Sequence, residues 1–497
     1  MANLNMYEDI KNGYLPKAIT FHYWKYPNLF FWIGSLFFFI GGISRGVTLL
    51  ISIIPLIILI FSVYGIGSRL HSRKAGALAV FIITTFPHVF SMSRYYTFDF
   101  NMMAFLALSI YTLLTTNHFD KTGNSILFGI CLGLTTLTRP SFCIFFIGPF
   151  IIYSYHSFFL KKKNTVNYNK RIVNLLFSII LTTLIALTWW NLSILVNRIH
   201  DASQYVPFFK VQPLGQWEPL HFNWGRILYY FNTLFGFQIL YYYSLLFIAG
   251  LIYFLLKKEN YFLLSGFLIP YFFFTFYIFH HTDIRFMLPY LIFIALIISV
   301  FLVGIKHKRI RFFLIILTLL LGLFQYLVLS YFPDSYPNFQ KINSFFKFDQ
   351  DTDWEFKNFQ NSTNPWWDIY TPWYIGILSS TRNKWDYNAL IEIIQHSLNS
   401  TKGEYLIYLH GEAVRPLQYI IRFDRYKNLN INLIYIPYNV PISAGSIING
   451  DFVIVDNTYS YNTTEINDAG YILIDNPKFP IPVEIYAKRK NSSAPLN

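Results

Sequence analysis

The chain has 497 residues, of which 54% are hydrophobic and 21% aromatic, whereas only 13% carry a charge. A soluble globular protein rarely has this composition, which is typical of a protein that crosses a membrane several times. The net charge of +14 is uneven: residues 1–332 carry 25 Lys and Arg against 8 Asp and Glu, and residues 333–497 carry 14 against 17. Lys and Arg in short loops set the orientation of a membrane region, so the basic excess does not indicate a nucleic-acid partner.

The first apolar stretch, residues 27–42, follows a polar N-terminal segment and is rich in Phe, with Trp32 among its residues. Counted as a span, it would invert every later loop and place the basic run 161–163 outside the cell, against the positive-inside rule. We therefore expect it to form an interfacial or re-entrant helix on the outer face of the membrane.

Ten further apolar stretches approach or reach the length that spans a membrane, and the short ones fit helices that end inside a protein-lined cavity. These stretches are residues 47–68, 75–92, 100–115, 124–138, 141–159, 172–195, 238–256, 261–279, 286–304 and 312–331. When all ten are counted as spans, five alternate loops hold 15 Lys and Arg, whereas the opposite side holds seven from Arg45 to Arg285. The positive-inside rule then places the basic loops in the cytoplasm and residues 333–497 outside.

The sequence thus predicts three regions. Residues 1–46 form part of a first outer loop with the interfacial helix, residues 47–332 form the transmembrane bundle, and residues 333–497 form an extracytoplasmic domain. In the last region, helical periodicity at 386–398 alternates with short stretches typical of strands. The predicted strands are residues 404–409, 431–436, 451–456 and 470–475. The predicted fold class is therefore an all-α polytopic membrane bundle of about ten spans followed by an α/β domain.

Two charges stand between the apolar stretches 75–92 and 100–115, namely Arg94 and Asp99. A charge at membrane depth costs about 2.5–3.5 kcal/mol on insertion scales, so it usually has a partner or a function. One interpretation is a wet turn between two spans. The other is an active site on the outer membrane face, in which the forked guanidinium binds a phosphate and the carboxylate takes a proton or holds a divalent cation.

A second polar cluster, from His280 to Arg285, precedes the stretch 286–304. Arg285 would hold a second phosphate oxygen, or else act as a snorkelling anchor or as an ion-pair partner of Asp283. His281 is a candidate contact to the substrate. A metal site is less favoured, because neighbouring histidines at this depth are more often interfacial than metal-binding. We predict no metal-ligand cluster here.

Arg139, followed by Pro140, stands between the stretches 124–138 and 141–159. Its place between two short spans that end on the outer side leaves two interpretations open. It is either a cavity residue that contacts the substrate or part of a turn.

Five segments, taken in order, resemble motifs of one family of membrane enzymes. They are Lys25–Leu29, Gly67–Leu70, Ser93–Asp99, Gly133–Pro140 and Arg285–Pro289. The chain resembles the polyprenol-phosphate-sugar-dependent glycosyltransferases, which include the protein mannosyltransferases and the lipid A aminoarabinose transferases. The resemblance covers roughly residues 5–305, and the order and membrane placement of the motifs make it more specific than any one motif.

The resemblance implies a helical bundle of the C-type glycosyltransferase fold, with its site on the outer face and a variable extracytoplasmic C-terminal domain. It implies that Asp99 corresponds to the family's second outer-loop acidic residue and Arg94 to the arginine that precedes it. It also implies that Arg285 contacts the phosphate of the lipid donor.

The chain departs from the family's pattern at its start. The family's first outer loop begins with an Asp-Glu pair just after the first span, and that Asp is the usual catalytic base. Here Tyr7–Gly13 resembles the later part of that loop, and Glu8 and Asp9 stand closer to Tyr26-Pro27 than the family's pair does. We expect either that a first membrane helix and the base precede Met1, or that a short N-terminal tail crosses unassisted, which makes Glu8 and Asp9 the candidate catalytic residues.

Together these features predict a multi-pass glycosyltransferase of the plasma (inner) membrane, with its active site outside. It would move a sugar from a polyprenyl-phosphate carrier to a lipid, glycan or protein acceptor, with inversion. Its partners would be the donor lipid, membrane lipid and an acceptor. The sequence determines neither the identity of the acceptor nor whether the reaction requires a divalent cation. The alternatives are a membrane transporter or lipid flippase, which intramembrane charges and broken helices also fit, and an inactive accessory membrane subunit.

Overall fold

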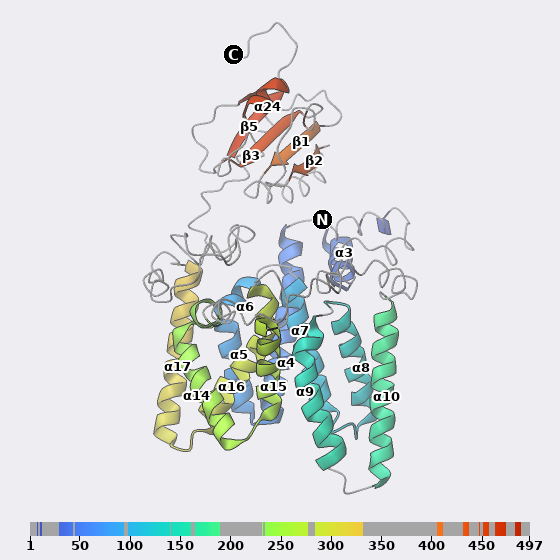
Figure 1. The fold of residues 1–497 in the computed structure, drawn as a ribbon, viewed down its shortest axis with the longest axis vertical. Coiled ribbons are helices and arrows are strands. Elements are labelled where there is room, and N and C mark those ends of the chain that lie inside the picture. Colours follow the sequence, from blue (N-terminus) through green and yellow to red (C-terminus); the bar gives the residue numbers. More distant parts are fainter. Residues whose placement is uncertain are drawn as a thin grey trace. The chain divides into compact units, whose positions relative to one another are not determined.

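The structure is a computed structural model in which two units are described, each by itself: a helical bundle and a C-terminal sheet (Figure 1). It describes residues 7, 10–11, 29–42, 45–93, 98–139, 141–160, 165–188, 231, 234–276, 284–331, 405–410, 431–436, 447, 451–456, 463–473 and 483–488. All structural statements below refer to these residues.

The bundle consists of helices in an order that follows the apolar stretches of the sequence. They are α3 (Leu29–Gly41), α4 (Arg45–Leu70), α5 (Arg73–Thr85), α6 (Pro87–Met92), α7 (Phe98–Thr115), α8 (Thr122–Thr136), α9 (Phe142–Tyr155), the π-helix η1 (His156–Leu160), α10 (Thr165–Leu187), the π-helix η2 (Leu234–Gln238), α14 (Leu240–Lys257), α15 (Tyr261–Phe276), the 3₁₀ helix η3 (Ile284–Tyr290), α16 (Leu291–Gly304) and α17 (Lys308–Tyr331).

Each of the ten predicted stretches coincides with one of these helices or with two in succession. Six segments are long and apolar enough to cross a membrane: Leu50–Leu70, Phe98–Thr115, Phe142–Leu160, Tyr168–Leu187, Met287–Gly304 and Lys308–Leu327. Four shorter apolar helices accompany them: Leu29–Gly41, Thr122–Thr136, Tyr242–Lys257 and Tyr261–Phe274. The polytopic helical bundle is thus confirmed, and the number of about ten spans stays a prediction.

Successive long helices of the bundle run in opposite directions (Figure 1), which gives the bundle two ends. We call the end at which α7 begins the Asp99 end and the end at which α7 gives way to the loop 116–121 the Asp120 end. The short connections at 71–72, 258–260 and 305–307 also lie at the Asp120 end. The described parts of the basic loops predicted to share one side of the membrane therefore lie at one end of the bundle.

The core of the bundle is formed by α16 and α7. In the segment Met287–Gly304, 83% of the residues are buried, whereas in Lys308–Leu327 on α17 only 17% are. The outer helices α10 and α17 expose large apolar side chains such as Phe177 and Phe312. Such a surface would be unstable in water and is typical of helices that face lipid.

Small residues and caps set the local geometry of α4 and α5. Ser72 is the N-cap of α5, and its side chain accepts a hydrogen bond from Ala75 N at 3.3 Å. Gly67 and Gly76 let the two helices approach closely, because a Cβ added at Gly67 would stand 2.7 Å from the Cα of Gly76. Close contacts through small residues are a common way for membrane helices to associate.

Three of the predicted stretches are interrupted near the Asp99 end. The stretch 75–92 breaks at Phe86, whose backbone is extended, and continues as α6 from Pro87. The carbonyl of Thr85 at this break accepts a hydrogen bond from Gln325 Nε2 at 3.0 Å, so a buried acceptor is satisfied by another helix. The stretch 286–304 begins as η3 and becomes α16 at Leu291, and η2 precedes α14.

The C-terminal unit contains a five-stranded mixed sheet in the order β2-β1-β3-β5-β4. Its strands are β1 (Tyr405–His410), β2 (Ile431–Ile436), β3 (Phe452–Asp456), β4 (Tyr471–Leu473) and β5 (Val483–Lys488), and the helix α24 (Thr463–Asp468) precedes β4. Both β2 and β3 pair with β1 in parallel, whereas β5 is antiparallel to β3 and to β4. The buried side chains packed together here are Tyr408, Ile447, Val453, Val455, Ile466, Ala469, Tyr471 and Tyr486.

Four strands of this sheet were predicted from the sequence, and β5 was missed. Val483–Lys488 follows the segment 478–482, in which two prolines are typical of a loop, and its own alternation of apolar and polar residues is short. The predicted helix at 386–398 and the boundary at 332/333 lie outside the described residues. The division into residues 1–46, 47–332 and 333–497 stays a prediction.

Candidate active site

A buried ion pair joins two of the predicted site residues at the Asp99 end. Asp99 lies in the first turn of α7, and Arg139 follows the C-terminal end of α8. Arg139 Nη1 donates a hydrogen bond to Asp99 Oδ1, and the exposed fractions of the two side chains are 4% and 11%, respectively. Charges this deeply buried are stable only when paired.

The pairing depends on the way α7 and α8 pack against each other. Ser109 Oγ and Thr135 Oγ1 are 2.7 Å apart, and Thr135 Oγ1 also donates to the carbonyl of Phe105 at 2.9 Å. These contacts fix the two helices at a position between the ends of α7. Because they set the register of the helices, the start of α7 and the residues after α8 meet, and Asp99 reaches Arg139.

The helix α3 covers the residues next to the ion pair. Leu29 packs with Phe105 and Leu137 in one buried cluster, and Trp32 packs against the same cluster. The ring of Phe30 stacks on Phe98 with a centroid distance of 4.1 Å. An apolar cover of this kind excludes water and strengthens the electrostatic interactions beneath it.

Arg285 lies on η3, where the structure describes its backbone, and η3 packs against α7. The element that carries Arg285 is therefore in contact with the element that carries Asp99. Arg94, Glu8, Asp9 and His281 lie outside the described residues.

The sequence analysis did not single out a third polar group at this end, which we call the amide bridge: His88, Gln238 and Tyr290. Gln238 Nε2 donates a hydrogen bond to His88 Nδ1 at 2.9 Å, and the hydroxyl of Tyr290 donates to Gln238 Oε1. All three residues are at most 1% exposed. His88 inside an otherwise apolar stretch was the one available signal, because a buried imidazole requires a partner.

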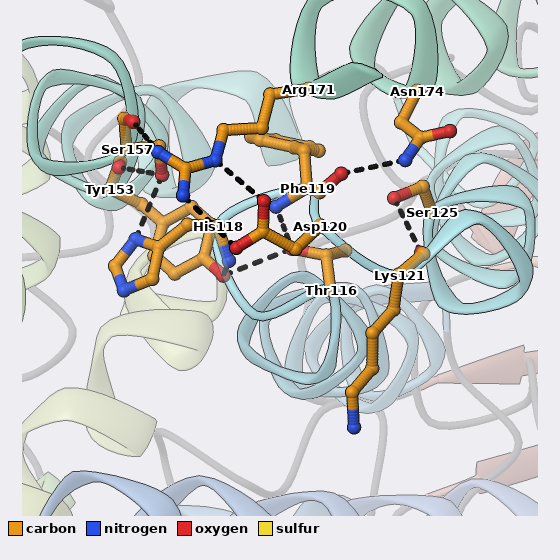
Figure 2. Close-up of polar contacts among 10 residues, drawn as sticks. All are labelled: Thr116, His118, Phe119, Asp120, Lys121, Ser125, Tyr153, Ser157, Arg171 and Asn174. Carbon is orange, nitrogen blue, oxygen red and sulfur yellow. Dashed lines mark hydrogen bonds and ion pairs between the residues drawn. The ribbon is translucent and has the colours of Figure 1, made fainter. Parts of the chain in front are cut away.

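A second ion pair lies at the Asp120 end, where α7 gives way to the loop before α8 (Figure 2). Arg171 of α10 donates from Nε to Asp120 Oδ1 at 2.6 Å and from Nη2 to Asp120 Oδ2 at 3.1 Å. Its Nη1 donates to the carbonyl of Ser157 at 2.9 Å, so that every nitrogen of the guanidinium is engaged. This fork fastens the loop to η1 and α10.

The loop itself is held in an uncommon conformation. Asn117, His118 and Phe119 have positive φ angles of 51°, 62° and 64°. Figure 2 shows the contacts that hold them: His118 N donates to the hydroxyl of Tyr153 at 2.7 Å, and Asn174 Nδ2 donates to the carbonyl of Phe119 at 2.7 Å. Three successive left-handed residues persist only when their surroundings fix them in this way.

In the described part of the chain there is no group of three His, Cys, Asp or Glu side chains that could hold a metal ion. The chemistry available at the Asp99 end is that of an ionised carboxylate beside a guanidinium. Such a pair is able to orient a hydroxyl or to balance the charge of a phosphate.

Fold and composition define the class of protein as a multi-pass integral membrane protein. Residues 25–190 match the model of the family of dolichyl-phosphate-mannose-protein mannosyltransferases. The matched range contains α3, Asp99, Arg139 and both ion pairs. The resemblance predicted from the sequence is therefore confirmed for residues 25–190.

Among solved structures, the chain is similar to ArnT from Cupriavidus metallidurans in the apo state, with a TM-score of 0.59 and 12% sequence identity over 97% of this chain and 91% of that chain. The same protein bound to undecaprenyl phosphate gives a TM-score of 0.57 and 12% identity over 95% and 89% of the two chains. The oligosaccharyltransferase of Archaeoglobus fulgidus in complex with Zn and sulfate has a TM-score of 0.43 and 15% identity over 94% and 65%. No curated protein sequence matches the chain.

Proposed function

We propose that this protein transfers a sugar from a polyprenyl-phosphate carrier to an extracytoplasmic acceptor, which is a lipid, a glycan or a protein. The observation that carries the proposal is the buried Asp99–Arg139 pair beneath α3, beside the element that bears Arg285. The family of residues 25–190 is named for a lipid-phosphate sugar donor, and the similar ArnT structure contains undecaprenyl phosphate. Both support a lipid phosphate as the leaving group.

In the proposed reaction, a carboxylate of the segment before α3 removes the proton from the acceptor hydroxyl or amine. Glu8 and Asp9 are the candidates for this base in the present chain. The acceptor atom forms a bond to the anomeric carbon while the bond from that carbon to the phosphate oxygen breaks. The electron pair leaves with the polyprenyl phosphate, and the anomeric configuration is inverted.

Arg94 and Arg285 bind the phosphate of the donor and stabilise the charge that grows on it as the bond breaks. Removing one preorganised donor of this kind typically lowers the rate by about 100- to 1,000-fold. His281 adds a contact to the substrate next to Arg285. These residues would lie on the outer side of the plasma membrane, because the basic loops at the Asp120 end belong in the cytoplasm.

Asp99 orients the acceptor, and Arg139 holds Asp99 in its ionised form and in place. One oxygen of Asp99 already accepts a hydrogen bond from Arg139, which favours this role over that of a ligand for a divalent cation. Arg139 itself is then a positioning residue rather than a direct phosphate contact.

The proposal is tested with the purified full-length protein in nanodiscs, supplied with radiolabelled sugars carried on undecaprenyl phosphate and with membranes of the native host as the source of acceptor. We expect label to move to an acceptor and undecaprenyl phosphate to be released, and Arg94→Ala to reduce both by 100-fold or more. Arg73→Gln is the matched control, because Arg73 is exposed at the Asp120 end. An unchanged rate in Arg94→Ala would refute the assignment.

A transporter or flippase would behave differently in the same material. Reconstituted in vesicles, it would move the lipid-linked sugar between leaflets without breaking the bond to phosphate. Net lipid movement without release of undecaprenyl phosphate would therefore replace the present proposal, and an accessory subunit would produce neither.

A further inference from the structure

Two short connections at the Asp120 end carry cations whose charge is largely unbalanced. One connection joins α14 to α15, and the other joins α16 to α17 (Figure 1). We call this group the basic surface: Lys257, Lys258, Lys306, Lys308, Arg309 and Arg311. Its lysines and Arg309 are exposed, and Arg311 is half-buried. Glu259 is the one acidic residue in these two connections, and the six cations form no ion pair with any described residue.

The two connections are neighbours, because α14 and α16 pack on each other and both run toward the Asp120 end. The rings of Tyr253 on α14 and Phe301 on α16 have a centroid distance of 5.6 Å. Lys257 follows Tyr253 by four residues, and Lys306 follows Phe301 by five. Each step is about 6–8 Å along the helix axis. The cations of the two connections therefore lie at the same level, at the adjacent ends of two helices.

Arg311 is held in a defined orientation within the basic surface. Its Nη1 donates to the carbonyls of Val303 at 3.3 Å and Ile305 at 3.4 Å, which lie at the C-terminal end of α16. Its Nε and Nη2 have no hydrogen-bond partner in the described part of the chain. Two nitrogens on one edge of a guanidinium match two oxygens of a phosphate. Arg311 is therefore preoriented for an anion outside the protein.

The cations that begin α17 are unfavourable for the helix itself. Lys308, Arg309 and Arg311 stand at its N-terminal end, where the helix dipole disfavours positive charge, and its first turn contains no acidic residue. The positive-inside rule accounts for the sign of these charges, but it does not remove the repulsion among them. An anion bound between the two connections would remove it.

Apolar side chains that face lipid begin directly beside the basic surface. Leu256 precedes Lys257 and is 79% exposed, and Phe312 follows Arg311 and is 69% exposed. A ligand that covers both would place an anionic group on the cations and hydrocarbon on the helices. An anionic phospholipid has both parts, whereas a soluble nucleotide or an acidic protein segment would leave the apolar side chains uncovered. Clusters of about 4–8 Lys and Arg next to membrane helices are typical of sites for such lipids.

We propose that the basic surface binds the head group of an anionic phospholipid in the leaflet at the Asp120 end. Nε and Nη2 of Arg311 hold its phosphate, and Lys257 and Lys258 balance its charge from the neighbouring connection. The bound lipid joins the ends of α14, α16 and α17. The inference goes beyond the proposed function and does not depend on sugar transfer, which is assigned to the opposite end of the bundle.

The test measures dissociation constants for single lipid molecules by mass spectrometry of the intact full-length protein in detergent. The probes are phosphatidylglycerol, which is anionic, and phosphatidylcholine, which has no net charge. We expect the parent protein to bind the first phosphatidylglycerol about tenfold more tightly than phosphatidylcholine. Arg311→Gln should weaken binding of phosphatidylglycerol about fivefold, because one cation near the head group contributes about this factor. Arg311→Lys should recover only part of the loss, since it restores the charge but not the paired donors.

Two double variants separate a local site from the general charge of this end. Lys257→Gln with Lys258→Gln removes two exposed charges of the basic surface and should weaken binding of phosphatidylglycerol tenfold or more. Lys121→Gln with Lys170→Gln is the matched control, because it removes two exposed charges at the same end, from the α7–α8 connection and from α10. We expect the control to bind phosphatidylglycerol as the parent does.

Two results would overturn the inference. If the control weakened binding as much as the Lys257 and Lys258 variant, the lipid would respond to the summed charge of the Asp120 end rather than to this surface. If the parent bound the two lipids equally, the basic surface would not be a lipid site. Neither result bears on the proposed function, because no sugar donor takes part in the measurement.

Discussion

The ion pairs at the two ends of α7 differ in kind. At the Asp120 end, Arg171 holds both oxygens of Asp120 and a backbone carbonyl, within a loop pinned by further hydrogen bonds (Figure 2). At the Asp99 end, the pair is more deeply buried, as Asp99 is 11% exposed against 28% for Asp120. It lies beneath an aromatic cover and beside η3.

This difference distinguishes an ion pair with a structural role from one in a candidate functional site. The fork of Arg171 joins three segments and fixes a strained loop, so its role is explained by structure alone. The Asp99–Arg139 pair joins neighbouring segments that Ser109 and Thr135 already hold together. A buried ion pair is weak evidence for stability, because its desolvation can outweigh its attraction. Its presence at the Asp99 end therefore favours a catalytic role.

The largest expected effect is that of Asp99→Asn. The change removes the negative charge beside Arg139 at almost constant volume, and it should reduce sugar transfer by about 100-fold or more. Placing a neutral amide opposite the buried charge of Arg139 should also lower the free energy of unfolding by about 3–5 kcal/mol. The measurements are the rate of undecaprenyl phosphate release per folded molecule and thermal unfolding in the same detergent.

The double variant Asp99→Asn with Arg139→Gln sharpens this result. Because neither charge is then left unpaired, much of the stability should return, whereas transfer should stay as low as in Asp99→Asn. If both stability and transfer were restored in the double variant, the Asp99–Arg139 pair would have a structural role only, like the pair of Asp120 with Arg171.

A smaller effect is expected from Asp120→Asn, and it should concern stability rather than sugar transfer. Loss of the charged hydrogen bonds from Arg171 should lower the free energy of unfolding by about 1.5–3 kcal/mol. The transfer rate of the molecules that remain folded should equal that of the parent. Reduced transfer at unchanged thermal stability would show instead that the Asp120 end takes part in the reaction, and the contrast between the two ends would fail.

The sequence located the helical stretches and singled out Asp99 and Arg139, but it did not predict the pairing of charges. Hydrophobic length alone located the spans, because a membrane imposes it. Arg139 stands 40 residues from Asp99, and Arg171 stands 51 from Asp120, so each contact depends on how helices pack. The loop at Asp120 was predicted only as one of the five cytoplasmic connections.

The helix interruptions near the Asp99 end could not be predicted from the sequence either. Pro87 signals a possible break, yet the π and 3₁₀ segments η2 and η3 depend on Gln238, which joins residues 150 and 52 positions away in the chain. Local patterns carry no information on such a contact. The same reason explains the missed strand β5, which is recognisable only when paired with β3 and β4.

The smallest effect concerns the strained loop at the Asp120 end, where Asn117 has a φ of 51° and an exposed side chain. Asn117→Gly should leave the free energy of unfolding within about 0.5 kcal/mol of the parent, since glycine adopts this conformation freely but loses more entropy on folding. Asn117→Val should destabilise by about 1–2 kcal/mol, because a branched side chain clashes there. Thermal unfolding of the two variants measures the difference, and both should transfer sugar at the parent rate. Equal stability of the two variants would mean that the loop does not require the left-handed conformation at this position. The hydrogen bonds of Arg171 would then not be needed to stabilise a strained loop.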